Sequence, residues 1–164
     1  MSRPFAIALA AILAAAVAAP LAQAGDYKLG ALTIRQPWSR PAQAGMNGVG
    51  FMTIANAGKT PVTLQRVETT AAGSVEIHQS AMVNGVMTMR EQDKGVVIPA
   101  GGQVAFAPGG YHLMILSLKA AQGVGQKVPV TLVFDNGRKA QVDLTVQLTP
   151  PAGGQASTAP EHRH

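Results

Sequence analysis

From Tyr27 onward, apolar residues alternate with polar ones over short runs that are broken by Gly, Pro and Asn, and no helical period is visible. Val, Ile, Thr and Leu dominate these runs, as is typical of β-strands. Regularly spaced short strands predict an all-β domain, an antiparallel Greek-key β-sandwich. The predicted strands are 31–35, 48–56, 62–69, 74–80, 86–92, 95–98, 103–106, 112–118, 128–134 and 139–147.

One predicted hairpin has a register that can be worked out from the sequence. Asn84-Gly85 lies between β-prone apolar residues, which is a strong signal for a two-residue turn. If Val83 faces Val86, the numbers of opposed residues add up to 169. His78 then faces Glu91, Ser80 faces Met89 and Met82 faces Met87, all on one side of the ribbon. His78 and Met89 become diagonal neighbours with backbones about 7–8 Å apart.

The two ends of the chain differ from the middle. Arg3, the apolar run 5–19 and Ala22-Gln23-Ala24 form the pattern of an export signal with a small-x-small cleavage site. The apolar run is short for a membrane span, so we expect no stable membrane insertion after cleavage. We therefore predict a signal peptide over 1–24, one domain over 25–149 and a flexible tail over 150–164, in a protein exported to the periplasm.

The composition excludes several classes of function. The formal net charge is +5, but the basic residues are scattered and no basic stripe with interleaved aromatics predicts nucleic-acid binding. The absence of cysteine excludes thiolate metal sites and cysteine nucleophiles. No nucleophile motif of a serine hydrolase is present, and we expect no enzymatic activity.

Histidine and methionine gather in the segment 76–114. It contains His78, His112 and four of the six methionines that follow Met1. His112 and Met114 are two residues apart and leave a strand on one side. Thioether sulfur is a soft, neutral donor that suits Cu(I) and offers little to zinc, magnesium or calcium. We predict that His78, Met89, His112 and Met114 share one Cu(I) ion, with Met87 close to them, whereas Met46 and Met52 are expected to be core filler.

Two features leave alternatives open. His162 and His164 in the tail either capture Cu(II), which prefers nitrogen and oxygen ligands, or are incidental residues of a short basic tail. Trp38, the one tryptophan, is either a core anchor or part of an apolar collar beside the metal.

The chain resembles the PCu(A)C family of periplasmic copper chaperones. The family signature is a histidine, ten residues, a methionine, about twenty-one residues and then His-x-Met. His78 and Met89 have the ten-residue gap, 22 residues separate Met89 from His112, and His112-Leu113-Met114 closes the pattern. The stretches QPWSR, GVMTMRE, IPAGG and PGGYHLM are also similar, and the resemblance covers about 32–148.

The resemblance implies a cupredoxin-like β-sandwich with an exposed Cu(I) site at His78, Met89, His112 and Met114. It further implies delivery of Cu(I) to the copper-bearing subunit of cytochrome c oxidase, alongside a Sco-type thiol protein. The extra residue before His112 matters because a slip by one position would turn that histidine to the other face. The alternatives are a copper-buffering or resistance protein without a specific client, a copper-dependent enzyme, and an exported β-sandwich interaction domain in which the cluster is incidental.

Overall fold

The computed structural model describes residues 25–152, and this range contains eleven β-strands and no helix. The predicted signal peptide and most of the predicted tail, including His162 and His164, lie outside the described residues. The strands are β1 (Tyr27–Leu29), β2 (Leu32–Ser39), β3 (Gly48–Asn56), β4 (Val62–Glu68), β5 (Ala72–Val83), β6 (Val86–Glu91), β7 (Val96–Ile98), β8 (Gln103–Phe106), β9 (Tyr111–Leu118), β10 (Lys127–Phe134) and β11 (Lys139–Val146). The all-β prediction is confirmed, with each predicted strand present.

Two differences from the predicted strands have local causes. β1 is only three residues long, and an alternation this short does not identify a strand from sequence. β2 continues past the predicted end at Arg35, through Gln36 and Pro37. Its pairing with β3 shifts register between Arg35 and Trp38, and Gln36 has φ 47°, so the proline is accommodated by a bulge rather than by the end of the strand.

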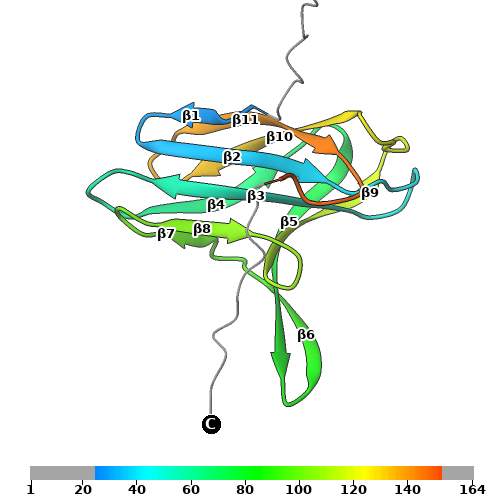
Figure 1. The fold of residues 1–164 in the computed structure, drawn as a ribbon, viewed down its shortest axis with the longest axis horizontal. Coiled ribbons are helices and arrows are strands. Elements are labelled where there is room, and N and C mark those ends of the chain that lie inside the picture. The colour runs from blue at the N-terminus through cyan, green and yellow to red at the C-terminus, as the bar shows by residue number, and fades with distance from the viewer. Residues whose placement is uncertain (1–24, 153–164) are drawn as a thin grey trace, which may run out of the picture.

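The strands form one sheet that curls over on itself (Figure 1). Their order is β6-β5-β9-β8-β3-β2-β11-β10-β4-β7, with β1 attached to β2 and an additional pairing of β3 with β9. The pairing is antiparallel except at two short contacts: Thr145 and Val146 of β11 run parallel to Trp38 and Ser39 of β2, and Phe106 of β8 pairs in parallel with Tyr111 of β9.

One hydrophobic core lies between the facing halves of this curled sheet. Its fully buried side chains come from both halves, with Ile34, Ile54 and Leu113 on one side and Leu64 and Leu132 on the other. Burial of such side chains stabilises the fold by about 1.5–3 kcal/mol each. The body is therefore a sandwich stabilised by its hydrophobic core, and the chain has no cysteine that could form a disulfide.

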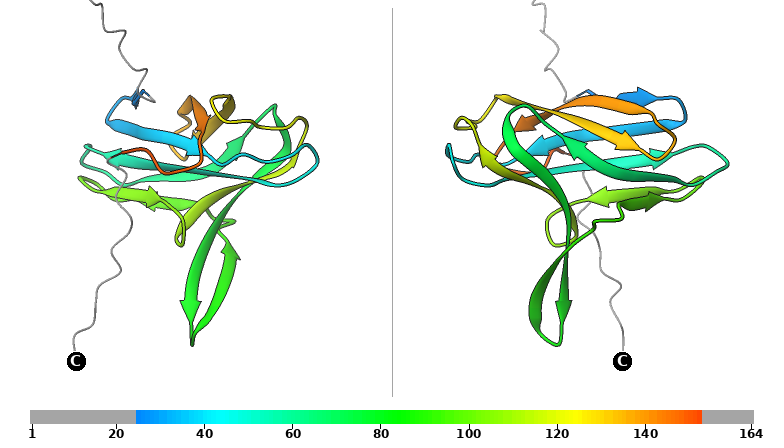
Figure 2. Two further views of the ribbon diagram at one scale, coloured as in Figure 1. Left: turned by 45° about the vertical axis from the view of Figure 1, so that its right-hand side comes forward. Right: turned by 180° about the vertical axis from the view of Figure 1, so that it is seen from behind.

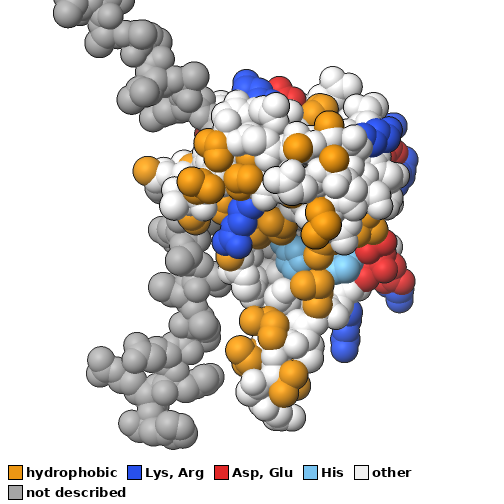
Figure 3. Space-filling model, turned by 90° about the vertical axis from the view of Figure 1, so that its right-hand side faces the viewer, with side chains coloured by type: hydrophobic (Ala, Val, Ile, Leu, Met, Phe, Trp, Pro, Cys, Tyr) orange, Lys and Arg blue, Asp and Glu red, His pale blue; other side chains and the backbone are white. Residues whose placement is uncertain are grey.

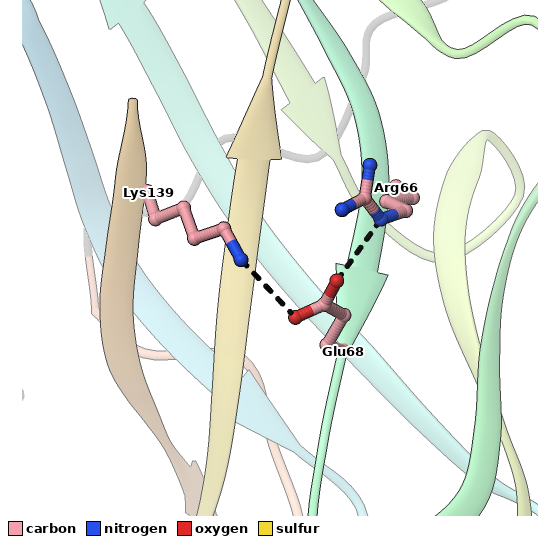
Figure 4. A network of polar contacts seen from close by, with 3 residues as sticks. All are labelled: Arg66, Glu68 and Lys139. Carbon is pink, nitrogen blue, oxygen red and sulfur yellow. Dashed lines mark hydrogen bonds and ion pairs between the residues drawn. The ribbon is translucent and has the colours of Figure 1, made fainter. Parts of the chain in front are cut away.

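A charged cluster on the outside of the body contributes much less. Glu68 of β4 pairs with the guanidinium of Arg66 (Nε–Oε1 3.0 Å) and with Lys139 of β11 (Nζ–Oε2 3.8 Å), as Figure 4 shows. All three side chains are about half exposed, so each pair is expected to contribute at most about 1 kcal/mol.

Within residues 25–152, the β5–β6 hairpin is the part that leaves the body (Figures 1 and 2). The first half of β5 pairs with β9, its second half pairs with β6, and all six residues of β6 are exposed. Among residues 25–152 no helix is long and apolar enough to cross a membrane.

Candidate metal site

The hairpin has the register that the sequence predicts. Val83 pairs with Val86, Met82 with Met87, Ser80 with Met89 and His78 with Glu91. Asn84 (φ 51°) and Gly85 (φ 78°) both have positive φ, which is the backbone of a type I′ turn and matches the right-handed twist of the strands. Met89 therefore lies diagonally across the ribbon from His78 and on the same face.

A second pairing brings the other two candidate residues to that face. β5 and β9 are antiparallel, with His78 opposite His112 and Glu76 opposite Met114. Ile77 and Leu113, which point the other way, are buried in the core. The four side chains at positions 76, 78, 112 and 114 thus share the outer face of the sheet, and the extra residue before His112 has not shifted it out of phase.

The two imidazole rings are close and their orientations are fixed by hydrogen bonds. Their centroids are 5.8 Å apart, with an angle of 56° between the planes. His78 Nε2–H donates to Oε2 of Glu76 at 2.8 Å, and His112 Nδ1–H donates to the carbonyl oxygen of Gly110 at 3.1 Å. The same carbonyl accepts the backbone N–H of Ser80 at 3.0 Å, so one loop oxygen connects β5 and the histidine of β9.

These hydrogen bonds leave one lone pair free on each neutral ring. Because carboxylate and carbonyl oxygens can only accept, the protons are on Nε2 of His78 and Nδ1 of His112. The free donors are therefore Nδ1 of His78 and Nε2 of His112. Nδ1 of His78 is buried, and within residues 25–152 it has no hydrogen-bond partner. A buried polar atom without a partner is uncommon, and metal coordination would satisfy it.

The four candidate donors differ in how far they are exposed to solvent. His112 is only 5% exposed, Met114 and His78 are partly buried, and Met89 is 53% exposed. Figure 3 shows histidine side chains, in pale blue, where the hairpin joins the body, with hydrophobic side chains continuing along the hairpin below them. The structure brings the histidines together and places Met89 and Met114 on their face; that these four side chains bind a metal ion stays a prediction.

Glu76 is the neighbour that the sequence analysis missed. Its signal was its position two residues before His78, which places both side chains on one side of an extended strand. Glu91 is opposite His78, as predicted, but is exposed, and the carboxylate that hydrogen-bonds the imidazole is that of Glu76. Two acidic side chains next to neutral donors favour a cation at this place.

The methionine and tryptophan expectations have mixed outcomes. Met52 is buried in the core, but the prediction for Met46 was wrong, since that side chain is 61% exposed in the loop before β3. Trp38 is buried against Phe51, with ring centroids 4.7 Å apart and the guanidinium of Arg40 about 6 Å from both rings. Neither ring belongs to the main core cluster.

The donor set limits which ion could bind. Within residues 25–152, no group of three or more His, Asp or Glu side chains is arranged to hold a metal ion. On the face of the histidine pair, Met89 and Met114 offer thioether sulfur, and mixed nitrogen–thioether sites are suited to Cu(I).

Comparison with known proteins places this geometry in context. Residues 32–146 match the model of a family described as "LpqE-like: Putative lipoprotein LpqE-like". A relative from Leifsonia xyli subsp. xyli, "Putative lipoprotein Lxx21020", is 33% identical over 126 residues, which cover 77% of this chain and 75% of the relative.

Two solved structures show the same fold. The apo PCuAC domain from PmoF1 is 28% identical, with a TM-score of 0.64 over 76% of this chain and all of that domain. The solution structure of Cu(I)-DR1885 from Deinococcus radiodurans is 26% identical, with a TM-score of 0.51 over 70% of this chain and 78% of that one. The predicted cupredoxin-like sandwich and the predicted resemblance to PCu(A)C domains, also written PCuAC, are confirmed.

Proposed function

Because the chain belongs to the LpqE-like family and resembles PCuAC domains in fold and sequence, we propose that it is a copper chaperone that carries Cu(I) as cargo on His78, Met89, His112 and Met114. Related domains bind copper: one neighbour is described as copper-bound and another as the Cu(I) form. Neither is described as an enzyme, and we propose a carrier without catalytic activity.

The observation that carries the proposal is the pair of facing histidines, in each of which one ring N–H donates a hydrogen bond to a neighbouring oxygen. Nε2–H of His78 is held by Glu76 and Nδ1–H of His112 by the Gly110 carbonyl, so the remaining nitrogens are available as lone-pair donors. Met114 lies on the same face two residues after His112, and Met89 lies across the hairpin from His78.

The charges of these groups explain how the cargo is both held and released. Two imidazoles and two thioethers are neutral, so Cu(I) keeps its full positive charge and is bound less tightly than by thiolates. Met89 is the exposed donor, and an acceptor can replace it first. We propose capture at the histidine pair, docking of the acceptor on the side of Met89, and stepwise exchange of the ligands toward thiolates.

Location and partners follow from the same proposal. We propose that the protein is exported to the periplasm by its N-terminal segment, which agrees with the lipoprotein description of its family. The proposed recipient is the copper-bearing subunit of cytochrome c oxidase, and a Sco-type thiol protein is proposed to act alongside this chain in delivery. His162 and His164 are proposed as a separate, weaker Cu(II) site.

A competition titration tests the site. Purified protein is titrated with Cu(I) against a chromophoric chelator, and one equivalent is expected to bind tightly enough to compete with the chelator. Met89→Ala and His112→Ala should each weaken binding strongly, because each removes one of four donors. Met46→Ala is the control for Met89→Ala, since Met46 is also more than half exposed but lies outside the candidate site. Full stoichiometric binding by both site variants would rule the proposed site out.

A transfer assay tests the chaperone role. The Cu(I)-loaded protein is mixed with an apo copper-site fragment of cytochrome c oxidase, and metallation of the fragment is followed by its absorption spectrum. Metallation of the fragment that is faster from the loaded protein than from the Cu(I)–chelator complex alone supports a chaperone. Retention of the metal would identify a copper buffer instead.

A further inference from the structure

The outer half of the β5–β6 hairpin is unusually apolar for a ribbon that packs against nothing. Met82, Val83, Val86, Met87 and Met89 are each at least half exposed. The hairpin points away from the body in every view (Figures 1 and 2). Exposed apolar groups that gather in this way indicate a functional surface rather than a structural one.

The methionines are separated from the valines by the strand alternation. Met82 and Met87 are directly opposed, Met89 is diagonal to Met82, and all three lie on the face that carries His78. Val83 and Val86 lie on the other face, as does Arg90, so the methionine face contains no basic side chain between the turn and Glu91.

The pairing brings Met82 and Met87 especially close. Val83 and Val86 flank the two-residue turn and form its hydrogen-bonded pair, so the next pair, Met82 and Met87, is of the non-hydrogen-bonded kind. In such pairs the Cα atoms are only about 4.5 Å apart. Thioethers on flexible unbranched side chains at that separation can turn to one common point.

Packing does not explain these residues. Met82 is 63% and Met87 55% exposed, so neither fills a gap in a core. On a solvated strand, β-branched or polar residues are the favoured types. The property that methionine adds here is a soft sulfur donor that needs no deprotonation.

We infer that Met82 and Met87, with Met89 as a third donor when it is free, form a second binding site for a soft monovalent cation at the tip of the hairpin. This site goes beyond the proposed function, because it needs neither histidine. It is weaker than a site with imidazole ligands and open to solvent, and Met89 lies between it and His78. Met89 could therefore pass an ion from the tip of the hairpin to the histidine pair.

Silver(I) is the appropriate probe because it is soft, monovalent and stable to air. The methyl resonances of ¹³C-methyl-labelled methionine report coordination at each sulfur separately. In a His78→Ala/His112→Ala variant of the full chain, the methyl signals of Met82 and Met87 should shift as one equivalent of Ag(I) is added. Those of Met46, an exposed methionine outside the hairpin, should not shift.

A Met82→Leu/Met87→Leu double change made in that histidine variant should abolish the binding. Leucine conserves the volume and both side chains are exposed, so the amide spectrum should show an intact fold. Unshifted Met82 and Met87 signals, or shifts of Met46 of equal size, would overturn the inference.

The wild-type protein separates the two proposals. Shifts at Met82 and Met87 without a shift at Met114 would leave the tip site standing and remove the histidine–methionine site. A shift at Met114 with none at Met82 and Met87, even in excess Ag(I), would do the reverse.

Discussion

At the scale of single residues, Glu76 determines how His78 is presented. The carboxylate accepts the hydrogen bond from Nε2–H, which leaves Nδ1 with a free lone pair and fixes the ring plane. A carboxylate behind a metal-binding imidazole also raises its basicity, which strengthens binding of a cation. Glu91 faces His78 from the other strand but is exposed, so it adds negative charge near the imidazole without fixing the orientation of the ring.

Replacing Glu76 tests this role. We expect Glu76→Ala to lower Cu(I) affinity by about 10–100-fold, the usual effect of losing an outer partner of a metal-binding imidazole. Chelator competition measures it, and Glu76→Gln should recover most of the affinity because its carbonyl oxygen can still accept from Nε2–H.

Glu91→Ala is the matched control, because it removes a charge near His78 without removing the hydrogen bond to its ring. An equal loss of affinity in the Glu76→Ala and Glu91→Ala variants would mean that charge alone matters and that Glu76 does not position the ring.

At the scale of elements, the hairpin is an appendage whose order depends on its turn. Strand β6 pairs with β5 alone and all six of its residues are exposed, whereas the first half of β5 pairs with β9 and contributes Ile77 to the core. Local order in the hairpin can therefore be lost while the body stays folded.

Alanine at Gly85 tests this independence. Gly85 has φ 78° and a Cβ added there would meet nothing within 4 Å, so the cost of Gly85→Ala is conformational, about 1–2 kcal/mol. We expect faster amide hydrogen exchange in 79–91 with an unchanged midpoint of global unfolding.

Gly137 provides the comparison, with φ 76° and equally open surroundings in the turn between β10 and β11. Because that hairpin is part of the sandwich, Gly137→Ala should lower global stability by a similar 1–2 kcal/mol. A global loss in the Gly85 variant would show that the hairpin and body unfold together.

The pairings of β5 with β6 and with β9 show how much of the candidate site could be predicted from the sequence. The hairpin register was predictable, because a two-residue turn and a period of two leave a single alignment of Met82 with Met87 and of His78 with Glu91. The pairing of His78 with His112 could not be predicted, since β5 and β9 are far apart in sequence and no local rule sets their alignment. The role of Glu76 was hidden for a related reason: the side-chain spacing was visible, but the rotamer that closes the hydrogen bond depends on packing.

At the scale of the whole molecule, the hydrophobic core and the candidate metal site are located in different places. The core lies between the two halves of the curled sheet, and the candidate site lies on the outer face of β5 and β9. Leu113 and Ile77 connect them, because they are the core-facing neighbours of His112 and His78.

A core truncation away from the site should therefore affect stability alone. Leu144→Ala removes a fully buried side chain of β11 and should lower the free energy of unfolding by about 2–5 kcal/mol. The Cu(I) affinity of the folded protein should stay unchanged, as measured by competition well below the unfolding transition.

Glu68→Gln is the surface control for that change. It breaks the ion pairs with Arg66 and Lys139, and denaturant titration should show a loss of about 1 kcal/mol or less. A Leu144→Ala protein that folds but has lost its affinity would mean that the candidate site depends on the far side of the sandwich.

The openness of the hairpin sulfurs also makes them targets for peroxide. Conversion of Met82, Met87 or Met89 to the sulfoxide would replace a soft sulfur donor by a hard oxygen and add polarity, while the buried Met52 would be shielded. Oxidative stress would thus remove the soft sulfur donors of the hairpin and leave the sandwich intact, and a methionine sulfoxide reductase would be needed to restore them.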